Sequence, residues 1–197
     1  MVAFCSKIIL KLKKANDMLK KYIKNNVLRE VIEWTATIAA AIIIGFLFSN
    51  FVVGRANVYG ESMMPTIHQS DVVLLNKFVY RFTKPKRNDI IVFPFKGQPE
   101  NKYIKRVIGL PGDVIDFSDG YLFVNGERLD DDFSDETKPG SIEYPHEVPE
   151  NCYFVLGDNR NHSNDSRAKE VGDVPAKIII GKAFIRVLPI NKINLIR

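Results

Sequence analysis

The sequence predicts a mainly β domain behind one N-terminal transmembrane helix. Short runs rich in β-branched and aromatic residues follow one another after residue 55, and turn-forming pairs such as Asn125-Gly126 separate them. The same region contains no long amphipathic helical pattern. Residues 34–54, which precede it, contain no charged side chain, and this favours a single apolar helix ahead of the β domain.

The N-terminal residues predict a membrane topology. Eight basic and three acidic side chains in residues 1–33 account for the whole net charge of +5, so the rest of the 197-residue chain is close to neutral. The run at 34–54 is long enough to cross the ~30 Å hydrocarbon core as a helix. Because basic flanks stay on the inner side of a membrane, we expect residues 1–33 to form a basic cytoplasmic arm and residues 55–197 an extracytoplasmic β-rich domain. Charge confined to an arm does not indicate nucleic-acid binding, which needs a basic folded face.

The apolar run has two other interpretations. A cleaved signal peptide normally has an apolar region of about 7–15 residues after a short basic start, and both parts are longer here. A buried helix of a soluble protein should show a polar stripe. We therefore expect an uncleaved signal-anchor at 34–54. It would make the chain a single-pass protein of the cell membrane, with the lipid bilayer as a partner and the C-terminal domain on the outer face.

The cysteine and histidine positions indicate neither a disulfide nor a metal site. Cys5 and Cys152 would lie on opposite sides of the membrane and cannot pair. His68, His146 and His162 are scattered and lack zinc-ligand spacing, so the sequence indicates no zinc site. His162 lies among polar residues and is either a candidate base or an ordinary solvated histidine.

Seven segments of the C-terminal region are candidate strands. They are residues 71–80, 89–93, 103–108, 113–117, 121–126, 152–157 and 177–188. The aromatic run FVYRF, residues 78–82, either belongs to an interior strand or rests on the membrane surface. The acidic stretch 130–150 contains three prolines, and we expect a long loop or small flap there.

The stretch YGESMMPTI, residues 59–67, raises the question of a nucleophile. Ser62 is followed by two methionines and the chain-stiffening Pro65, which fits either an ordinary turn or a nucleophile on a turn. A serine hydroxyl is a weak nucleophile until a base lies within hydrogen-bond reach. Histidine is the usual base, but nothing in the sequence fixes the nearby His68 beside Ser62.

Lysine is the other known base, provided that apolar surroundings keep it neutral. Lys105 lies in the apolar segment YIKRVIGLPGD, residues 103–113. In a strand it shares one face with Tyr103 and Val107, whereas Ile104 lies on the other. Lys105 is therefore a candidate base on a core face, and the alternative is a strand lysine whose ammonium reaches water.

A third segment, GDNRNHSNDSR at residues 157–167, is dense in hydrogen-bonding side chains. Asp165 and Arg167 can pair through two parallel hydrogen bonds. Such a network is either a solvated loop or a set of groups that orients catalytic side chains.

The motifs GESMMPT, YIKRVIGLPGD and GDNRNHSNDSR, in this order behind an N-terminal anchor, resemble those of bacterial type I signal peptidases. The short Gram-positive form is the most similar, and the resemblance extends from the apolar run to about Arg167. It implies the signal-peptidase-like β-rich fold. It also implies a membrane-bound serine endopeptidase that removes signal peptides from exported preproteins through a Ser-Lys dyad and an acyl-enzyme. The implied partners are those signal peptides, and the oligomeric state stays open.

The resemblance also assigns roles to residues. Ser62 matches the family nucleophile, and Lys105 matches the general base. The matched supporting residues are Ser163, which would hydrogen-bond to the lysine and orient it, the Asp165–Arg167 ion pair, and Asp158 in the same network. Gly60 stands where some members carry a serine that donates to the oxyanion hole, so this side-chain donor is missing. No cofactor is implied.

Substrates of such an enzyme would bind in extended form, as a strand added beside the dyad. The candidate substrate-binding residues are Met63, Tyr103 and Ile104. Shallow apolar pockets would accept small side chains, as in an Ala-x-Ala site.

Two other functions stay open from the sequence. A soluble serine–lysine self-cleaving repressor shares the β-rich fold, but the apolar run and the lack of a DNA-binding region count against it. An inactive membrane-anchored binding relative is the second. The complete set of Ser62, Lys105 and Ser163 counts against that function.

Overall fold

The computed structural model describes residues 10–18, 26–96, 98–130, 133 and 137–196, without the side chains of residues 26, 27, 47–51, 98 and 99. Residues 1–9 and 19–25 of the predicted basic arm lie outside the described residues. The chain divides into two compact units, residues 1–48 and residues 49–197.

The N-terminal unit is helical where it is described. Residues 10–18 are helical, and α2 spans Asn26–Phe51. It begins before the predicted run at 34–54, and it ends where the chain enters the first strand of the β domain. The Thr37 hydroxyl donates to the Glu33 carbonyl at 2.8 Å, so its polar group is satisfied within the helix. Within the described portions of the chain, no helix combines the length and the hydropathy needed to cross a membrane.

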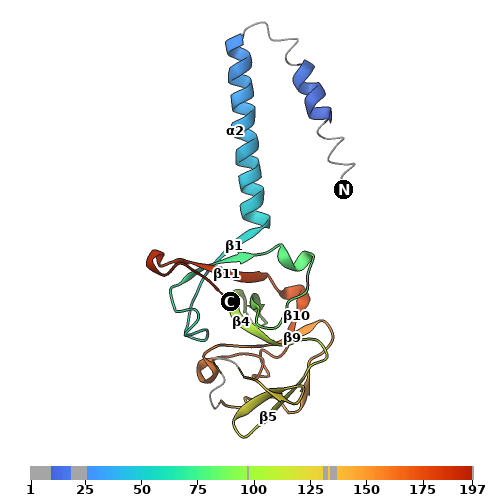
Figure 1. The fold of residues 1–197 in the computed structure, drawn as a ribbon, viewed down its shortest axis with the longest axis vertical. Helices are drawn as coiled ribbons and strands as arrows, with labels where there is room; N and C mark the ends of the chain where they lie inside the picture. Colours follow the sequence, from blue (N-terminus) through green and yellow to red (C-terminus); the bar gives the residue numbers. More distant parts are fainter. Residues whose placement is uncertain (1–9, 19–25, 97, 131–132, 134–136, 197) are drawn as a thin grey trace. The chain divides into compact units, whose positions relative to one another are not determined.

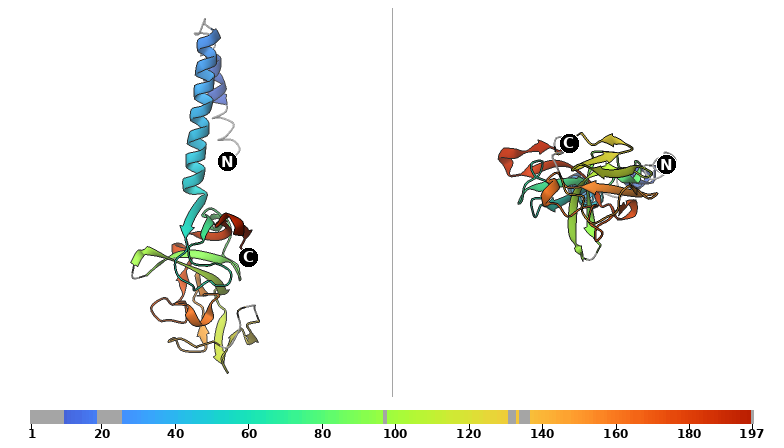
Figure 2. Two further views of the ribbon diagram at one scale, coloured as in Figure 1. Left: turned by 90° about the vertical axis from the view of Figure 1, so that its left-hand side faces the viewer. Right: turned by 90° about the horizontal axis from the view of Figure 1, so that it is seen from below.

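The C-terminal unit contains two antiparallel sheets (Figures 1 and 2). The strands of the larger, eight-stranded sheet lie in the order β1 (Val53–Asn57), β2 (Val72–Asn76), β11 (Gly181–Leu188), β3 (Ile90–Phe95), β4 (Gln98–Gly109), β9 (Cys152–Leu156) and β10 (Val174–Pro175), and β12 (Asn194–Leu195) pairs with β11. The smaller sheet has the order β7 (Glu127–Arg128), β6 (Tyr121–Val124), β5 (Val114–Ser118) and β8 (His146–Glu147). The predicted mainly β fold is confirmed.

The central strands of the larger sheet are apolar on both faces because both faces are buried. On one face of β3, Ile90 and Val92 pack in a cluster that also contains Met63. On the other face, Ile91 and Phe93 belong to a second cluster. Side chains alternate across the strand, so β3 reads as an unbroken apolar run rather than an alternating one.

A third apolar cluster joins the two sheets. Ile108 and Phe154 from the larger sheet pack with Ile115 and Leu122 from the smaller one. Among its described residues, the predicted flap at 130–150 contributes only the short strand β8.

The first predicted strand, residues 71–80, ends early. β2 stops at Asn76, and the chain then forms the 3-10 helix η1 (Val79–Arg81). The Asn76 side-chain carbonyl accepts the backbone N–H groups of Phe78 and Val79, both at 3.0 Å, and this turns the chain out of the sheet. The interpretation of the FVYRF run as an interior strand is therefore wrong.

Candidate active site

The loop between β1 and β2 carries Ser62 on a turn. Met63, beside it, is only 1% exposed and packs in the core beneath the turn, together with Ile67. The backbone N–H of Ile67 donates to the Met63 carbonyl at 2.8 Å, which closes the turn. Gly60 precedes it with φ +82°, a conformation that a residue with a side chain rarely adopts. Two buried apolar side chains therefore hold a half-buried serine in place.

Lys105 reaches this serine from β4. Its Nζ lies 2.7 Å from the Ser62 Oγ, within hydrogen-bond distance. The lysine is 4% exposed, so the alternative of an ammonium that reaches water is wrong. Burial lowers the pKa of Lys105 to about 8, although the carboxylates of Asp165 and Asp158 oppose this by stabilising the ammonium.

The strand alternation around Lys105 is as predicted. Lys105 and Tyr103 lie opposite Ile91 and Phe93 in the β3–β4 pairing, on the face of the second apolar cluster. The Lys105 Nζ lies 5.1 Å from the centroid of the Tyr103 ring. Ile104 points to the opposite face and packs against the first cluster. Tyr103 thus forms part of the wall that excludes water from the lysine.

The segment 157–167 contains a buried network built on Asp158, Asp165 and Arg167, although its middle, at Asn161 and His162, is exposed. Asp165 accepts hydrogen bonds from the Arg167 Nε and Nη2, each at 2.8 Å, in the predicted bidentate pair. Arg167 also donates to the Thr137 hydroxyl at 2.6 Å. Asp165 in turn accepts the backbone N–H of Gly157 at 3.1 Å, so the ion pair fixes the start of the segment.

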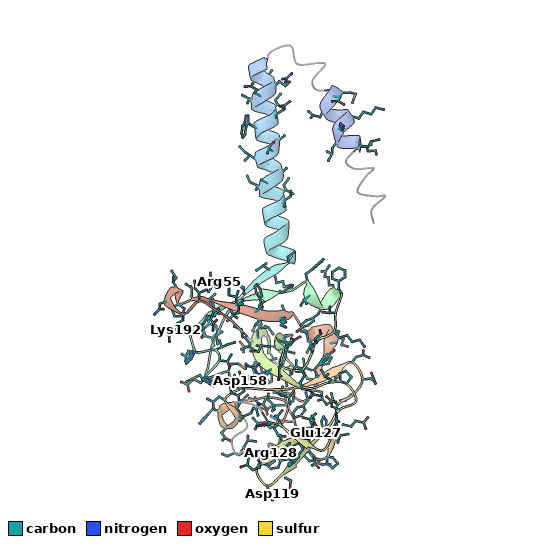
Figure 3. The ribbon with its side chains drawn as sticks, viewed as in Figure 1. Arg55, Asp119, Glu127, Arg128, Asp158 and Lys192 are labelled. Atoms are coloured by element: carbon teal, nitrogen blue, oxygen red, sulfur yellow. The ribbon has the colours of Figure 1, made fainter. Side chains whose placement is uncertain are left out.

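Asp158 belongs to a second bidentate pair that the sequence did not reveal. Its carboxylate accepts the Arg106 Nε at 2.8 Å and the Arg106 Nη2 at 2.7 Å. The same arginine lies 3.5 Å from the Thr66 hydroxyl, on the loop that carries Ser62. Arg106 therefore connects β4, the 157–167 segment and the nucleophile loop. In the sequence, the position of Arg106 directly after Lys105 was the feature that could have indicated its role at the site. Figure 3 labels Asp158 between Arg55 and Asp119, which lie at the two ends of the domain in this view.

Gly157 and Asn159 are further residues that sequence reasoning missed. The backbone N–H of Asn159 donates to the Ser62 carbonyl at 3.0 Å, and its side-chain amide donates to the Glu61 carbonyl at 3.2 Å. A Cβ atom at Gly157 would lie 2.4 Å from the Ser62 carbonyl oxygen and 2.2 Å from the Ser163 Oγ. The close approach of the two segments therefore requires glycine at this position.

Ser163 lies beside Gly157, but its predicted hydrogen bond to Lys105 is not formed. In the described part of the chain, the Ser163 Oγ is buried and has no hydrogen-bond partner. The Lys105 amine is directed to Ser62 instead.

The histidines do not form the dyad. His146 pairs with Asp173 at 2.8 Å, and the His68 Nδ1 is buried without a hydrogen-bond partner among the described residues. His162 is exposed at the end of the short helix Arg160–His162. The described residues include no group of three or more His, Cys, Asp or Glu placed to hold a metal ion.

Known proteins match this chain over most of its length. The sequence profile described as "Signal peptidase, peptidase S26" matches residues 31–188, which is most of the chain. The chain belongs to the signal peptidase family, peptidase S26. The resemblance in the three sequence motifs is thereby confirmed.

Several relatives match over most of their length. Signal peptidase I P of Bacillus subtilis subsp. natto is 37% identical over 173 residues, which cover 83% of this chain and 92% of that protein. Signal peptidase IB of Staphylococcus aureus (strain COL) is 31% identical, covering 83% and 93%. Probable signal peptidase I-2 of Synechocystis sp. is 36% identical, covering 84% and 77%. A crystal structure of a signal peptidase I from Enterococcus faecalis V583 is 35% identical, covers 51% of this chain and 97% of that chain, and has a TM-score of 0.43.

The family fixes the activity of the chain. It is a serine endopeptidase that removes signal peptides, and its substrates are the signal peptides of preproteins. This activity replaces the two alternatives from the sequence, a self-cleaving repressor and an inactive binding relative.

Proposed function

We propose that Ser62 is the nucleophile of this signal peptidase and that Lys105 is its general base. The observation that carries the proposal is the 2.7 Å contact between the Lys105 Nζ and the Ser62 Oγ in a buried site. A general base must lie within hydrogen-bond reach of the proton it takes, and its pKa should lie near the working pH, so that part of it is neutral. Burial lowers the pKa of Lys105 to about 8, which gives a neutral fraction near pH 7 that grows as pH rises.

The proposed reaction has two halves. Neutral Lys105 accepts the hydroxyl proton as the Ser62 Oγ attacks the scissile carbonyl, and the ammonium then protonates the leaving amine. This leaves an acyl-enzyme on Ser62. In the second half, Lys105 takes a proton from water, the hydroxide attacks the acyl carbon, and the proton returns to the serine oxygen.

The oxyanion of each tetrahedral intermediate needs hydrogen-bond donors. We propose the backbone N–H of Ser62 as one donor, typically worth a few kcal/mol. Gly60 offers no side-chain donor, so a backbone N–H or a water molecule supplies the second.

We propose that the supporting residues act through position. The Asp165–Arg167 and Asp158–Arg106 pairs would hold the 157–167 segment and β4 in register, so that the Lys105 amine stays on line with Ser62. Ser163, whose buried hydroxyl has no hydrogen-bond partner among the described residues, would orient that amine during turnover. None of these three roles requires contact with the substrate.

We propose that the substrate adds to β4 as an extended strand. β3 covers one edge of β4 from Gln98 to Arg106, whereas β9 covers the other edge only from Arg106 onward. Among the described strands, the second edge is thus unpaired up to Lys105. A peptide in this position would bring its scissile bond to Ser62, with Tyr103 and Ile104 along the edge and the buried Met63 as the floor of a small apolar pocket.

We propose the membrane topology that the sequence predicts: a cytoplasmic arm at 1–33, a signal-anchor at 34–54 and a catalytic domain outside the cell membrane. The charge distribution supports it.

Cleavage of a purified preprotein tests the dyad. Ser62→Ala and Lys105→Ala should each abolish cleavage, and Lys105→Arg should fail as well, because a guanidinium does not lose its proton in this range. Since the two residues act as a unit, the double variant should be little worse than either single one. Circular dichroism should show that each variant still folds. Near-normal activity of Lys105→Ala would overturn the mechanism.

A further inference from the structure

The connection between β2 and β3 gathers aromatic and basic side chains on the surface of the catalytic domain. We call residues 77–87, KFVYRFTKPKR, the basic–aromatic segment; it contains five basic residues and no acidic one. Phe82 is 70% exposed and Phe78 is 38% exposed. Single exposed apolar residues are ordinary, but two neighbouring rings among uncompensated cations are not.

The segment is held firmly while it presents these side chains. The Tyr80 hydroxyl donates to the buried Asp89 at 2.9 Å, and the Thr83 hydroxyl donates to the Val79 carbonyl at 3.0 Å. The rings of Phe78 and Phe82 lie edge to face, with centroids 4.8 Å apart. The two rings therefore form one fixed surface feature.

Three cations of the segment have no acidic partner among the residues that the structure describes. Arg81, Lys84 and Lys86 are exposed, and none of them makes an ion pair within the described part of the chain. Asp89 and Asp113 lie beside the segment, and both are already occupied, Asp89 by the Lys182 ammonium and Asp113 by the Arg87 guanidinium. An exposed surface that presents uncompensated cations beside aromatic rings fits a partner that is anionic on the outside and apolar beneath.

The location of the segment identifies that partner. The backbone N–H of Lys77 donates to the Val52 carbonyl at 2.9 Å, and Val53 pairs with Asn76. Helix α2 ends at Phe51. The segment therefore begins at the residue where the chain leaves the helix, and Figure 1 shows the short green helix η1 at the same end of the domain as β1.

We propose that the basic–aromatic segment binds the anionic phosphate headgroups of the bilayer. Arg81, Lys84 and Lys86 contact the phosphates, and the Phe82 ring enters the interface between headgroups and acyl chains. The proposal rests on the signal-anchor at 34–54. It adds a second attachment, which fixes the β1–β2 pair at the membrane and hence the height of Ser62 above it.

Fluorescence quenching in the full-length chain tests this. Trp34 is the only tryptophan, so Trp34→Phe combined with Phe82→Trp leaves one reporter, in the segment. This segment reporter is reconstituted into vesicles of phosphatidylcholine with or without phosphatidylglycerol, each carrying brominated acyl chains. We expect phosphatidylglycerol to increase its quenching several-fold, and added salt to reverse the increase. The distal reporter, Trp34→Phe combined with Tyr121→Trp at the opposite end of the domain, should show little quenching in either lipid.

Charge variants decide whether headgroups are recognised. In the segment reporter, Arg81→Gln, Lys84→Gln and Lys86→Gln together should return quenching to the phosphatidylcholine level. The matched control is Arg128→Gln, Lys138→Gln and Lys169→Gln, which removes the same charge from exposed sites elsewhere and should keep the increase.

Three results would overturn the proposal. The segment reporter could be quenched no more than the distal reporter, or equally in both lipids with no effect of the triple Gln variant. Alternatively, an acidic preprotein peptide could abolish the phosphatidylglycerol effect by competition, which would show that the segment binds a polypeptide.

Flotation of the chain with phosphatidylcholine vesicles reports on the anchor alone. A chain that does not float contradicts the anchor, whereas one that floats without lipid-dependent quenching contradicts only the segment.

Discussion

Replacing Lys105 by methionine should stabilise the protein while it removes the activity. The lysine is buried, and its pKa falls from 10.5 to about 8, so the folded state disfavours the ammonium by about 2.5 pKa units. At 1.36 kcal/mol per unit, this corresponds to roughly 3 kcal/mol. Methionine has a similar length and no charge, so Lys105→Met should recover most of that free energy at pH 7.

The sign of the pH dependence follows from the same shift. Below pH 8 both the folded and the unfolded state bind the proton, and the folded state carries the full cost of a buried ammonium. Between pH 8 and 10.5 the unfolded state binds more protons than the folded one, so the wild type gains stability as pH rises. The advantage of Lys105→Met should therefore fall from about 3 kcal/mol at pH 7 to about 1 kcal/mol near pH 9.5.

Denaturant unfolding in one detergent at a series of pH values measures this difference. Lys138→Met, at an exposed position, is the control and should change neither the free energy of unfolding nor its pH dependence appreciably. A Lys105→Met protein that is no more stable than the wild type at pH 7 would refute the reasoning. So would a gain that does not shrink as pH rises.

Three other outcomes follow from the site and the topology. Ser163→Ala should lower kcat roughly tenfold and change KM less, as measured by steady-state cleavage of a signal-peptide substrate, since the proposed role is to orient Lys105. An equal rise in KM would contradict that role. Gly157→Ala should lower the melting temperature and slow acylation, because the new Cβ would meet the Ser62 carbonyl and the Ser163 hydroxyl; overpacking of this kind typically costs about 1–3 kcal/mol. Single-turnover kinetics at the wild-type rate would contradict it. Protease added outside spheroplasts should digest residues 55–197 and spare residues 1–33, and protection of the C-terminal part would contradict the topology.

Local patterns made Ser62 and Lys105 candidates, and the resemblance of three motifs to a known family joined them as the proposed catalytic pair. Period-2 alternation placed Lys105 on the buried face beside Tyr103, and the structure has this arrangement. The turn at Ser62 followed from its glycine and proline neighbours. Buried runs such as β3 were recognised as strands because β-branched residues are concentrated in them.

The residues that connect these parts were not predictable in the same way. Arg106 bonds to Asp158, and Asn159 bonds to Glu61 across 98 positions of the sequence. Such contacts depend on how β4 and the 157–167 segment pack, which no local pattern encodes. Gly157 is similar, since its requirement for glycine comes from the approach of Ser62.

Two local errors have local causes. The strand predicted at 71–80 stopped at Asn76 because the side-chain carbonyl of that residue captures two backbone donors, and propensity alone cannot compete with that capping. Ser163 was expected to hydrogen-bond to Lys105 by analogy with the family, whereas the amine contacts Ser62 directly.

The pH dependence of kcat/KM tests most directly whether Lys105 is the base. On a short signal-peptide substrate, activity should rise with pH through an apparent pKa near 8, because the neutral amine is the active form. The His68→Ala, His146→Ala and His162→Ala variants should keep this limb unchanged. A limb near the ~6.5 of imidazole that disappears in any one of these variants would contradict the role of Lys105.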